Sequence, residues 1–183
     1  TGKTVDIHPD VPLSYILQRG MNYGFGLFRG FVRGIGFGQK GKRLFIGQGV
    51  SILAKRKLFV GKNVRIGKNV SIDALSKEGI HFADNVKIGD YSQIIGTGSI
   101  KNMWIGLKVG KNSSFSEYSL FGSAGGITIG DNVIAGQNVR FHAENHNYSD
   151  SNKLIVEQGV SRKGISVGHN CWIGAGAVFL DGS

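Results

Sequence analysis

Proline and cysteine are scarce in this chain of 183 residues, which holds two prolines and one cysteine. The single Cys171 excludes an internal disulfide and favours a reducing compartment. No apolar run reaches the roughly 18 residues that a membrane-spanning helix needs, and the first residues do not follow the pattern of a secretory signal peptide. We therefore expect one cytoplasmic domain whose chain turns without proline.

Acidic residues are scarce at the start of the chain. Residues 1–69 hold 13 Lys and Arg against two acids, Asp6 and Asp10, whereas the rest of the chain holds nine basic and ten acidic residues. The net charge of +10 therefore belongs to the N-terminal third. Such a basic surface attracts anionic lipid, nucleic acid or anionic polymer. The aromatic residues that would stack on bases are not interleaved with these charges, so we expect no nucleic-acid partner.

Glycine, by contrast, is abundant and recurs in a fixed frame of six residues. Each unit has an aliphatic residue, Gly, a variable residue, Asn and a small apolar residue. The units are Val60–Arg65, Ile66–Ser71, Val109–Ser113, Ile129–Val133 and Val167–Cys171, with Gly in place of Asn in Ile173–Ala177. A short fixed period indicates a β-helix of hexapeptide repeats. We expect the aliphatic and small residues, Cys171 included, to face inward, and Asn or Gly to occupy turns with positive φ.

With these motifs the chain resembles the hexapeptide-repeat acyltransferase family over roughly residues 44–183. The resemblance implies an all-β solenoid, a left-handed parallel β-helix of triangular section with three hexads per coil. We expect its repeats to start at Ile46 after a loop at Phe37–Arg43, and to be interrupted at Lys55–Lys57 and at Ala74–Ile80. The last hexad stops at its fifth position, so we expect further coils beyond Ser183.

Residues 1–43 form a separate, basic N-terminal segment that we expect to be partly helical. Apolar residues between Val11 and Arg33 recur roughly at helical spacing. Glycine at positions 20, 24, 26 and 30 disfavours one continuous helix, so we predict two short helical pieces. Two roles stay open for this segment. It caps the first coil, or it attaches the protein to the inner face of a membrane as a peripheral protein through its apolar and basic faces.

A long departure from the repeat, at about residues 141–166, opens with Phe141-His142-Ala143-Glu144-Asn145-His146-Asn147-Tyr148. An Asn-His-Asn-aromatic stretch at this place resembles the active-site loop of the sugar O-acetyltransferase branch. The resemblance makes His146 the general base. An imidazole that titrates near pH 6.5 can take the proton of a saccharide hydroxyl as that oxygen attacks acetyl-CoA. Glu144 and Asp150 are both candidates to orient the ring.

The resemblance also implies roles around this base. His142 occupies an outward hexad position, where it lines the acceptor pocket or serves as a second candidate base. Asn145 and Glu144 are further candidates for substrate binding. Trp172, at the outward sixth position of its hexad, packs beside the acceptor or against a neighbouring subunit or its own loop.

Donor binding and assembly follow from the same family. Its sites lie between the subunits of a homotrimer, with CoA in the groove between two rods. Lys163 and Arg162 are the candidates for the CoA phosphates. We expect no metal, and no covalent intermediate, because the thiol of Cys171 faces inward.

Three other functions remain. A sugar-nucleotide N-acyltransferase would share the fold, donor and base, and would differ only in the acceptor atom. A γ-type carbonic anhydrase needs three histidine ligands for zinc, for which this chain offers His81, His142 and His146. A non-catalytic scaffold has no need of a histidine-bearing insertion, and fold alone does not fix function.

Overall fold

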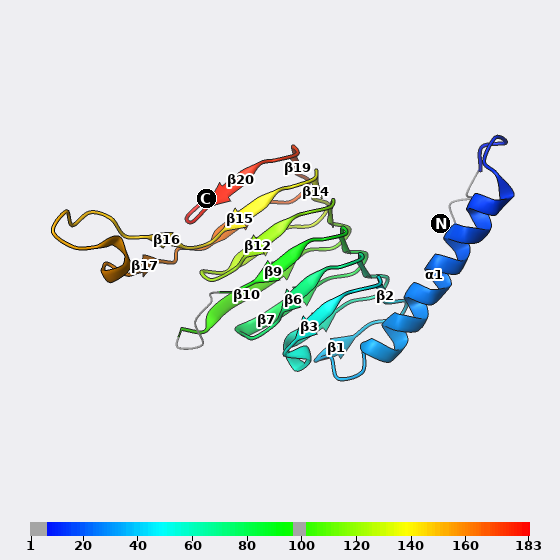
Figure 1. Ribbon diagram of the computed structural model, residues 1–183, viewed down its shortest axis with the longest axis horizontal. Helices are drawn as coiled ribbons and strands as arrows, with labels where there is room; N and C mark the ends of the chain where they lie inside the picture. The colour runs from blue at the N-terminus through cyan, green and yellow to red at the C-terminus, as the bar shows by residue number, and fades with distance from the viewer. Residues whose placement is uncertain (1–6, 97–101) are drawn as a thin grey trace.

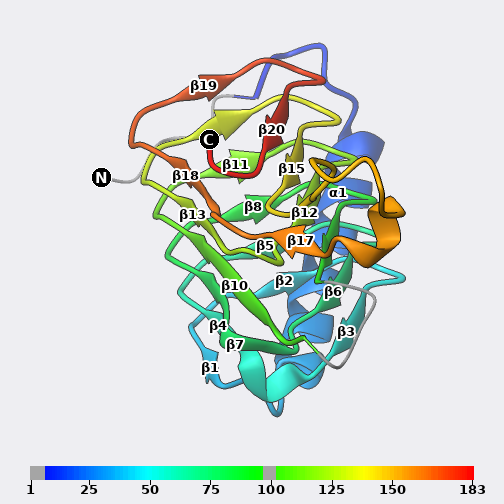
Figure 2. The ribbon, with the colours of Figure 1, turned by 90° about the vertical axis from the view of Figure 1, so that its left-hand side faces the viewer.

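The computed structural model describes residues 7–96 and 102–183. One helix, α1 (Leu13–Arg33), precedes a rod whose three faces are parallel six-stranded sheets (Figures 1 and 2). The chain visits the three faces in turn, so that each strand hydrogen-bonds to the strand one coil before it and one coil after it. The prediction of a parallel β-helix is confirmed.

We call the three faces sheets A, B and C, in the order in which each coil crosses them. Sheet A contains β1 (Gln39–Lys40), β4 (Leu58–Val60), β7 (Ser76–Phe82), β10 (Trp104–Val109), β13 (Ile127–Ile129) and β18 (Ile165–Val167). Sheet B contains β2 (Phe45–Ile46), β5 (Arg65–Ile66), β8 (Lys87–Ile88), β11 (Ser114–Phe115), β14 (Ile134–Ala135) and β19 (Trp172–Ile173). Sheet C contains β3 (Ser51–Leu53), β6 (Ser71–Asp73), β9 (Gln93–Ile95), β12 (Leu120–Gly122), β15 (Arg140–His142) and β20 (Val178–Leu180).

The interior of the rod is a column of apolar side chains, one from each face in each coil. Near the C-terminal end the column is aromatic. Phe121 and Phe141 stack at 5.2 Å between ring centroids, and Phe141 stacks on Phe179 at 4.9 Å. Phe115 meets Phe121 edge to face at 5.0 Å. Identical positions in successive coils thus pack on one another, which is why the hexad frame repeats along the chain.

The corner between sheets A and B carries an asparagine ladder. Its four residues have φ between 58° and 62° and are Asn63, Asn85, Asn112 and Asn132. Each side-chain amide donates to the next along the rod, at 3.0, 2.8 and 3.0 Å. Asparagine tolerates this left-handed conformation, and the stacked amides join the coils. The prediction of Asn at positive φ is confirmed.

Spacing is strict at two corners and loose at the third. Six residues separate equivalent inward residues from sheet A to B and from B to C, as from Val60 to Ile66 to Ile72. The third corner, from sheet C back to A, is always longer. It spans 8 residues from Ile52 to Val60 and 26 from Phe141 to Val167. Insertions therefore leave the rod along one edge.

The predicted interruption at residues 55–57 is the 3-10 turn η1 (Lys55–Lys57) at this third corner. The second predicted interruption, at Ala74–Ile80, is wrong in part, because most of these residues belong to β7 and not to a loop. β7 is longer than its neighbours and bulges at Gly79, whose φ is 85°. A positive φ at glycine lets the strand absorb extra residues without leaving the sheet.

α1 is one continuous helix, so the prediction of two short pieces is wrong. Gly26 and Gly30 are buried where the helix crosses the first coil. A Cβ at Gly26 would overlap the ring of Phe45, and one at Gly30 would overlap the carbonyl oxygen of Leu44. Glycine there permits close packing of helix on rod, and that packing offsets the cost of glycine in a helix.

The predicted loop at residues 37–43 contains β1, so the rod begins earlier than the hexad frame indicates. Gln39 and Lys40 pair in register with Phe59 and Val60 of β4, and the Gly38 N–H donates to the Leu58 carbonyl at 3.0 Å. Both residues of β1 are exposed, because this first strand has no coil before it and lacks the apolar residue that marks a hexad.

Candidate active site

Residues 144–164 leave the third corner between the fifth and sixth coils as a long loop that projects away from the rod (Figure 1). Its neck is a two-stranded antiparallel ribbon of β16 (Asn145–His146) and β17 (Val160–Ser161). Beyond the neck, the Asn147 N–H donates to the Gly159 carbonyl at 3.0 Å. The single turn η2 (Ile155–Glu157) lies near the tip. The loop is thus a hairpin with hydrogen-bonded sides.

The root of the loop is fixed by one carboxylate that the sequence did not single out. Asp181, just after β20, accepts the backbone N–H groups of Lys163 and Gly164, both at 2.8 Å. Gly125 lies beneath the root, where a Cβ would overlap the Ala143 carbonyl oxygen. No motif in the sequence predicts this role for Asp181, because the two residues that it binds are 18 and 17 positions away.

The tip is organised by Gln158, which sequence reasoning also missed. Its amide oxygen accepts the Asp150 N–H at 3.0 Å, and its amide nitrogen donates to the Asp150 carbonyl at 2.9 Å and the Lys153 carbonyl at 3.0 Å. One side chain therefore satisfies three backbone groups of the turn. A single glutamine in a loop forms no sequence pattern that would predict such a role.

His146 and Asn145 are exposed on the neck. Within the part of the chain that the structure describes, no hydrogen bond holds the His146 imidazole. An acceptor hydroxyl or a partner subunit can therefore approach the ring freely. His142 is half-buried at the end of β15, outward between the inward residues Phe141 and Ala143, as its frame predicted. The two histidines flank the point where the chain leaves the rod.

Neither carboxylate suggested for orienting His146 is free to do so. Glu144 accepts a hydrogen bond from Arg162 Nε at 2.6 Å, and both side chains are about three-quarters buried. Asp150 pairs with Lys153 at 3.0 Å. That lysine, together with the Asn152 N–H, holds the pKa of the Asp150 carboxyl below its ordinary value. Glu144 and Asp150 therefore hold the loop in shape.

Of the two residues suggested for binding CoA, one is engaged in an ion pair and the other has an unpaired side chain among the described residues. Arg162 is committed to Glu144, so its guanidinium stiffens the neck. Lys163 is exposed and its backbone N–H binds Asp181, while its ammonium makes no ion pair with any described residue. Lys163 is the better fit to a phosphate group.

Trp172 lies far from the loop of its own chain. It is 85% exposed on β19, as the prediction of an outward position required. Sheet B, which contains β19, is the face opposite the third corner of a three-faced rod, and Figure 1 shows β19 and β16 on opposite sides. One chain therefore does not bring Trp172 and His146 together.

The three histidines suggested for zinc do not converge. His81 is on β7 in sheet A, stacked on Phe59 at 4.4 Å, with its Nε2 2.7 Å from the Glu78 carbonyl oxygen. In residues 7–96 and 102–183, no three His, Cys, Asp or Glu side chains are grouped as metal ligands. Cys171 packs against the interior, as its hexad position predicted.

Comparison with known proteins supports the repeat assignment. The family model described as the hexapeptide repeat of succinyl-transferase matches residues 57–89 and 158–180. A comparison with curated proteins finds no match. Among solved structures, a maltose O-acetyltransferase from Clostridium difficile 630 aligns with a TM-score of 0.45 and 19% identity, covering 72% of this chain and 67% of that one. A likeness of this size leaves the activity open. Two segments of the chain thus match a model of the hexapeptide repeat, and the rod has the three-faced form of a hexapeptide-repeat β-helix.

Proposed function

We propose that the protein is an acetyl-CoA-dependent O-acetyltransferase that acts on a saccharide of a surface polysaccharide or its precursor. The observation that carries this proposal is the exposed His146 on the neck of the loop. The backbone that carries it is held in place by the pairing of β16 with β17, by the Glu144–Arg162 pair and by Asp181 at the root. A rigid support with an accessible imidazole is what a general base requires.

The reaction would be a direct transfer. His146 takes the proton of the acceptor hydroxyl, the oxygen forms a bond to the thioester carbon, and the C–S bond of acetyl-CoA breaks. The imidazolium then returns its proton to the departing thiolate. Lys163 would bind a CoA phosphate through its exposed ammonium. No nucleophile on the protein takes part, since the Cys171 thiol points towards the Gly168 and His169 carbonyls and the interior.

We further propose that the site is shared between subunits of a homotrimer. The position of Trp172 on the face opposite the loop supports this, because the residue can join a site with His146 only through a second copy. Leu154, Ile155 and Val156 are also exposed on the loop, at 56–78%. Exposed apolar groups of this kind favour contact with a partner surface.

The test is release of CoA thiol from acetyl-CoA with a panel of saccharides, amino sugars and sugar nucleotides. We expect acceptor-dependent release that falls by about two to four orders of magnitude in His146→Ala, the usual contribution of a general base. His8→Ala, an exposed histidine ahead of α1, is the matched control and should keep full activity.

Each result bears on a different part of the proposal. Undiminished release in His146→Ala would transfer the base role to His142. Acylation of amino sugars alone would replace the O-acetyltransferase by an N-acyltransferase. Failure to bind acetyl-CoA, measured by calorimetry, would overturn the acetyltransferase proposal as a whole.

A further inference from the structure

α1 has an apolar face that nothing in the described chain covers. The side chains of this outer apolar face are between 45% and 69% exposed and are Leu13, Leu17, Met21, Phe25, Phe28 and Val32. Their spacing of three and four residues places them along one side of the helix. Six large apolar residues in one exposed row exceed what a protein surface normally carries, so this row indicates a binding surface.

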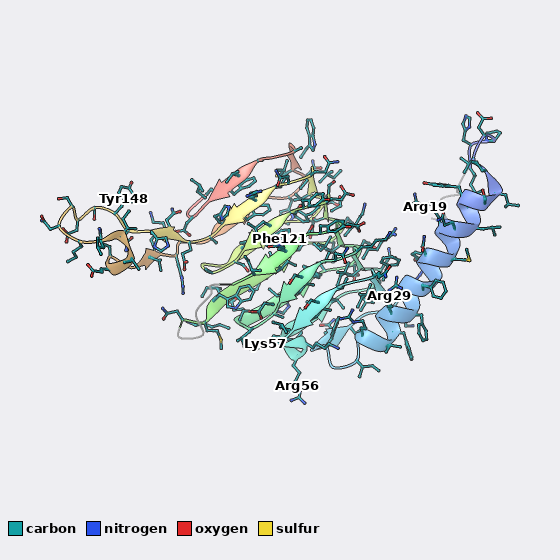
Figure 3. The ribbon with its side chains drawn as sticks, in the orientation of Figure 1. Arg19, Arg29, Arg56, Lys57, Phe121 and Tyr148 are labelled. Carbon is teal, nitrogen blue, oxygen red and sulfur yellow. The ribbon has the colours of Figure 1, made fainter. Side chains whose placement is uncertain are left out.

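The opposite side of α1 is already used. Gly26 and Gly30 are buried against the first coil, and Tyr23 stacks on Phe45 of β2 at 5.7 Å. At 100° per residue these positions point away from the outer apolar face. Figures 1 and 3 show the helix lying along the outside of the rod at its N-terminal end, so the outer apolar face looks away from the protein. The helix is thus a layer between the rod and whatever binds it.

The charge around this face is mostly positive, although Asp10 precedes the helix and Asp90 and Glu117 line the hollow between its inner side and sheet B. From Val11 to Asn69 the chain has twelve Lys and Arg and no acidic residue. Two of these lysines hold the end of the helix, where Lys40 Nζ donates to the Phe31 carbonyl and Lys55 Nζ to the Arg33 carbonyl, each at 3.3 Å. Arg56, in η1, points outward from the same end of the rod (Figure 3). The partner therefore carries negative charge.

A hollow of about 410 Å³ lies between α1 and the first coil, beside the outer apolar face. Three cationic residues line it, Lys40, Lys42 and Arg43, together with the apolar side chains of Leu27, Phe31 and Leu44. Cations next to apolar groups suit a ligand with a phosphate at one end and hydrocarbon at the other. A phospholipid has that chemistry.

We propose that α1 and the first coil form a docking surface for a membrane that contains anionic phospholipid. α1 lies in the plane of the interface, with its outer apolar face among the acyl chains and Lys40, Lys42 and Arg43 at the headgroup phosphates. None of the helices in the described ranges is both long and apolar enough to cross a bilayer. A second copy of the chain fits this surface less well, since it would bring two predominantly basic rims together.

The experiment is flotation of the protein with vesicles of phosphatidylcholine, alone or mixed with phosphatidylglycerol. The wild type should float with the anionic vesicles only, and less at high salt because the charges are then screened. Phe28→Asp and, two turns earlier, Met21→Asp should each lower the bound fraction by about tenfold or more, because a charge then enters the apolar layer. The combined change Lys42→Glu and Arg43→Glu should lower it by a similar factor of about ten.

Matched controls separate the surface from general effects. Val178→Asp changes a comparably exposed apolar residue of β20, and Lys111→Glu reverses an exposed lysine of the fourth coil; both should float like the wild type. Flotation with neither vesicle, or equally with both, would overturn the proposal. So would an assembly of the free protein that Phe28→Asp dissociates, which would assign the face to a second copy. The assay contains neither acetyl-CoA nor saccharide, so its outcome is independent of the proposed acetyl transfer.

Discussion

The third corner of the rod contrasts with the other two. The A–B and B–C corners are each a hexad long in every coil. The A–B corner carries the asparagine ladder and, beside it, Asp84 and Asp131, whose carboxylates accept the Lys62 and Lys111 backbone N–H groups. The third corner ranges from 8 to 26 residues over Ile52–Val60 and Phe141–Val167, and carries the candidate active-site loop. The interior column explains the difference. At the first two corners a step of six residues places the next inward side chain in register. At the third corner the connection can have any length, provided that the chain re-enters sheet A in register with the coil before it.

The comparison separates stability from activity. Interior and regular corners should account for the stability of the rod, because their contacts repeat from coil to coil. Within the described residues, the hydrogen bonds from the loop to the rod lie at its root, so the loop should contribute to transfer and little to global unfolding. Three changes test this separation, with expected effects that decrease in turn.

The largest effect is expected from Phe121→Ala. Phe121 is fully buried and its ring contacts those of Phe115 and Phe141. Loss of this ring leaves a cavity in the column and should lower the free energy of unfolding by about 3–5 kcal/mol. In the loop, Val156→Ala should change it by less than about 0.5 kcal/mol. Denaturant unfolding followed by circular dichroism measures both, and similar losses in the two variants would end the distinction.

A smaller effect is expected at the asparagine ladder. Asn112 has φ 58°, accepts from Asn85 and donates to Asn132. Asn112→Gly keeps the backbone conformation and loses the side-chain bonds, at a cost of about 1 kcal/mol. Asn112→Ala adds strain and should cost about 2 kcal/mol. Asn147→Ala, which removes a side-chain bond inside the loop, should not change the rod's unfolding midpoint. If the Gly and Ala variants of Asn112 were equally stable, the positive φ at this turn would not contribute to the loss of stability in Asn112→Ala.

The smallest effect concerns acid. The Lys62 backbone N–H donates to the Asp84 carboxylate at 2.8 Å. This hydrogen bond holds the pKa of Asp84 below its ordinary value. Its stabilisation is therefore complete above the ordinary carboxyl pKa of about 3.9 and is lost as pH falls through the lowered value. Thermal unfolding of Asp84→Asn should depend less on pH below about 4 than that of the wild type.

The loop supplies the matched case for acid. The pKa of Asp150 is lowered as well, first by Lys153, but this contact lies within the loop. Asp150→Asn should leave the pH dependence of rod unfolding unchanged. A flattened acid limb in Asp150→Asn would show that loop and rod unfold together.

Residue pattern was sufficient for the rod and for the outward and inward positions. Val60–Ser71 predicted two successive hexads, and both form with the expected faces. Trp172 was placed outward and Cys171 inward for the same reason. These positions depend on a two-residue alternation and a glycine or asparagine turn, which are local. The prediction of strands was wrong where the hexad frame is interrupted, at β1 and at the extended β7.

The partners of the loop residues could not be predicted. Glu144 and Asp150 were the two candidates to orient His146, yet Arg162 and Lys153 bind them. Gln158 and Asp181 have no motif, and they act through backbone groups that the fold brings to them. Whether His146 acts as a base stays a prediction for the His146→Ala assay.

By itself the sequence determined a repeating rod, a basic N-terminal third and a histidine-bearing insertion, because each of these follows from residue spacing or composition. Only the tertiary structure decided that α1 is continuous, that its apolar face is left open, and that Trp172 and His146 lie on opposite sides. Each of those outcomes depends on contacts between residues far apart in the chain. The contact of Gly30 with Leu44 permits the helix, and the order of the three faces separates sheet B from the third corner.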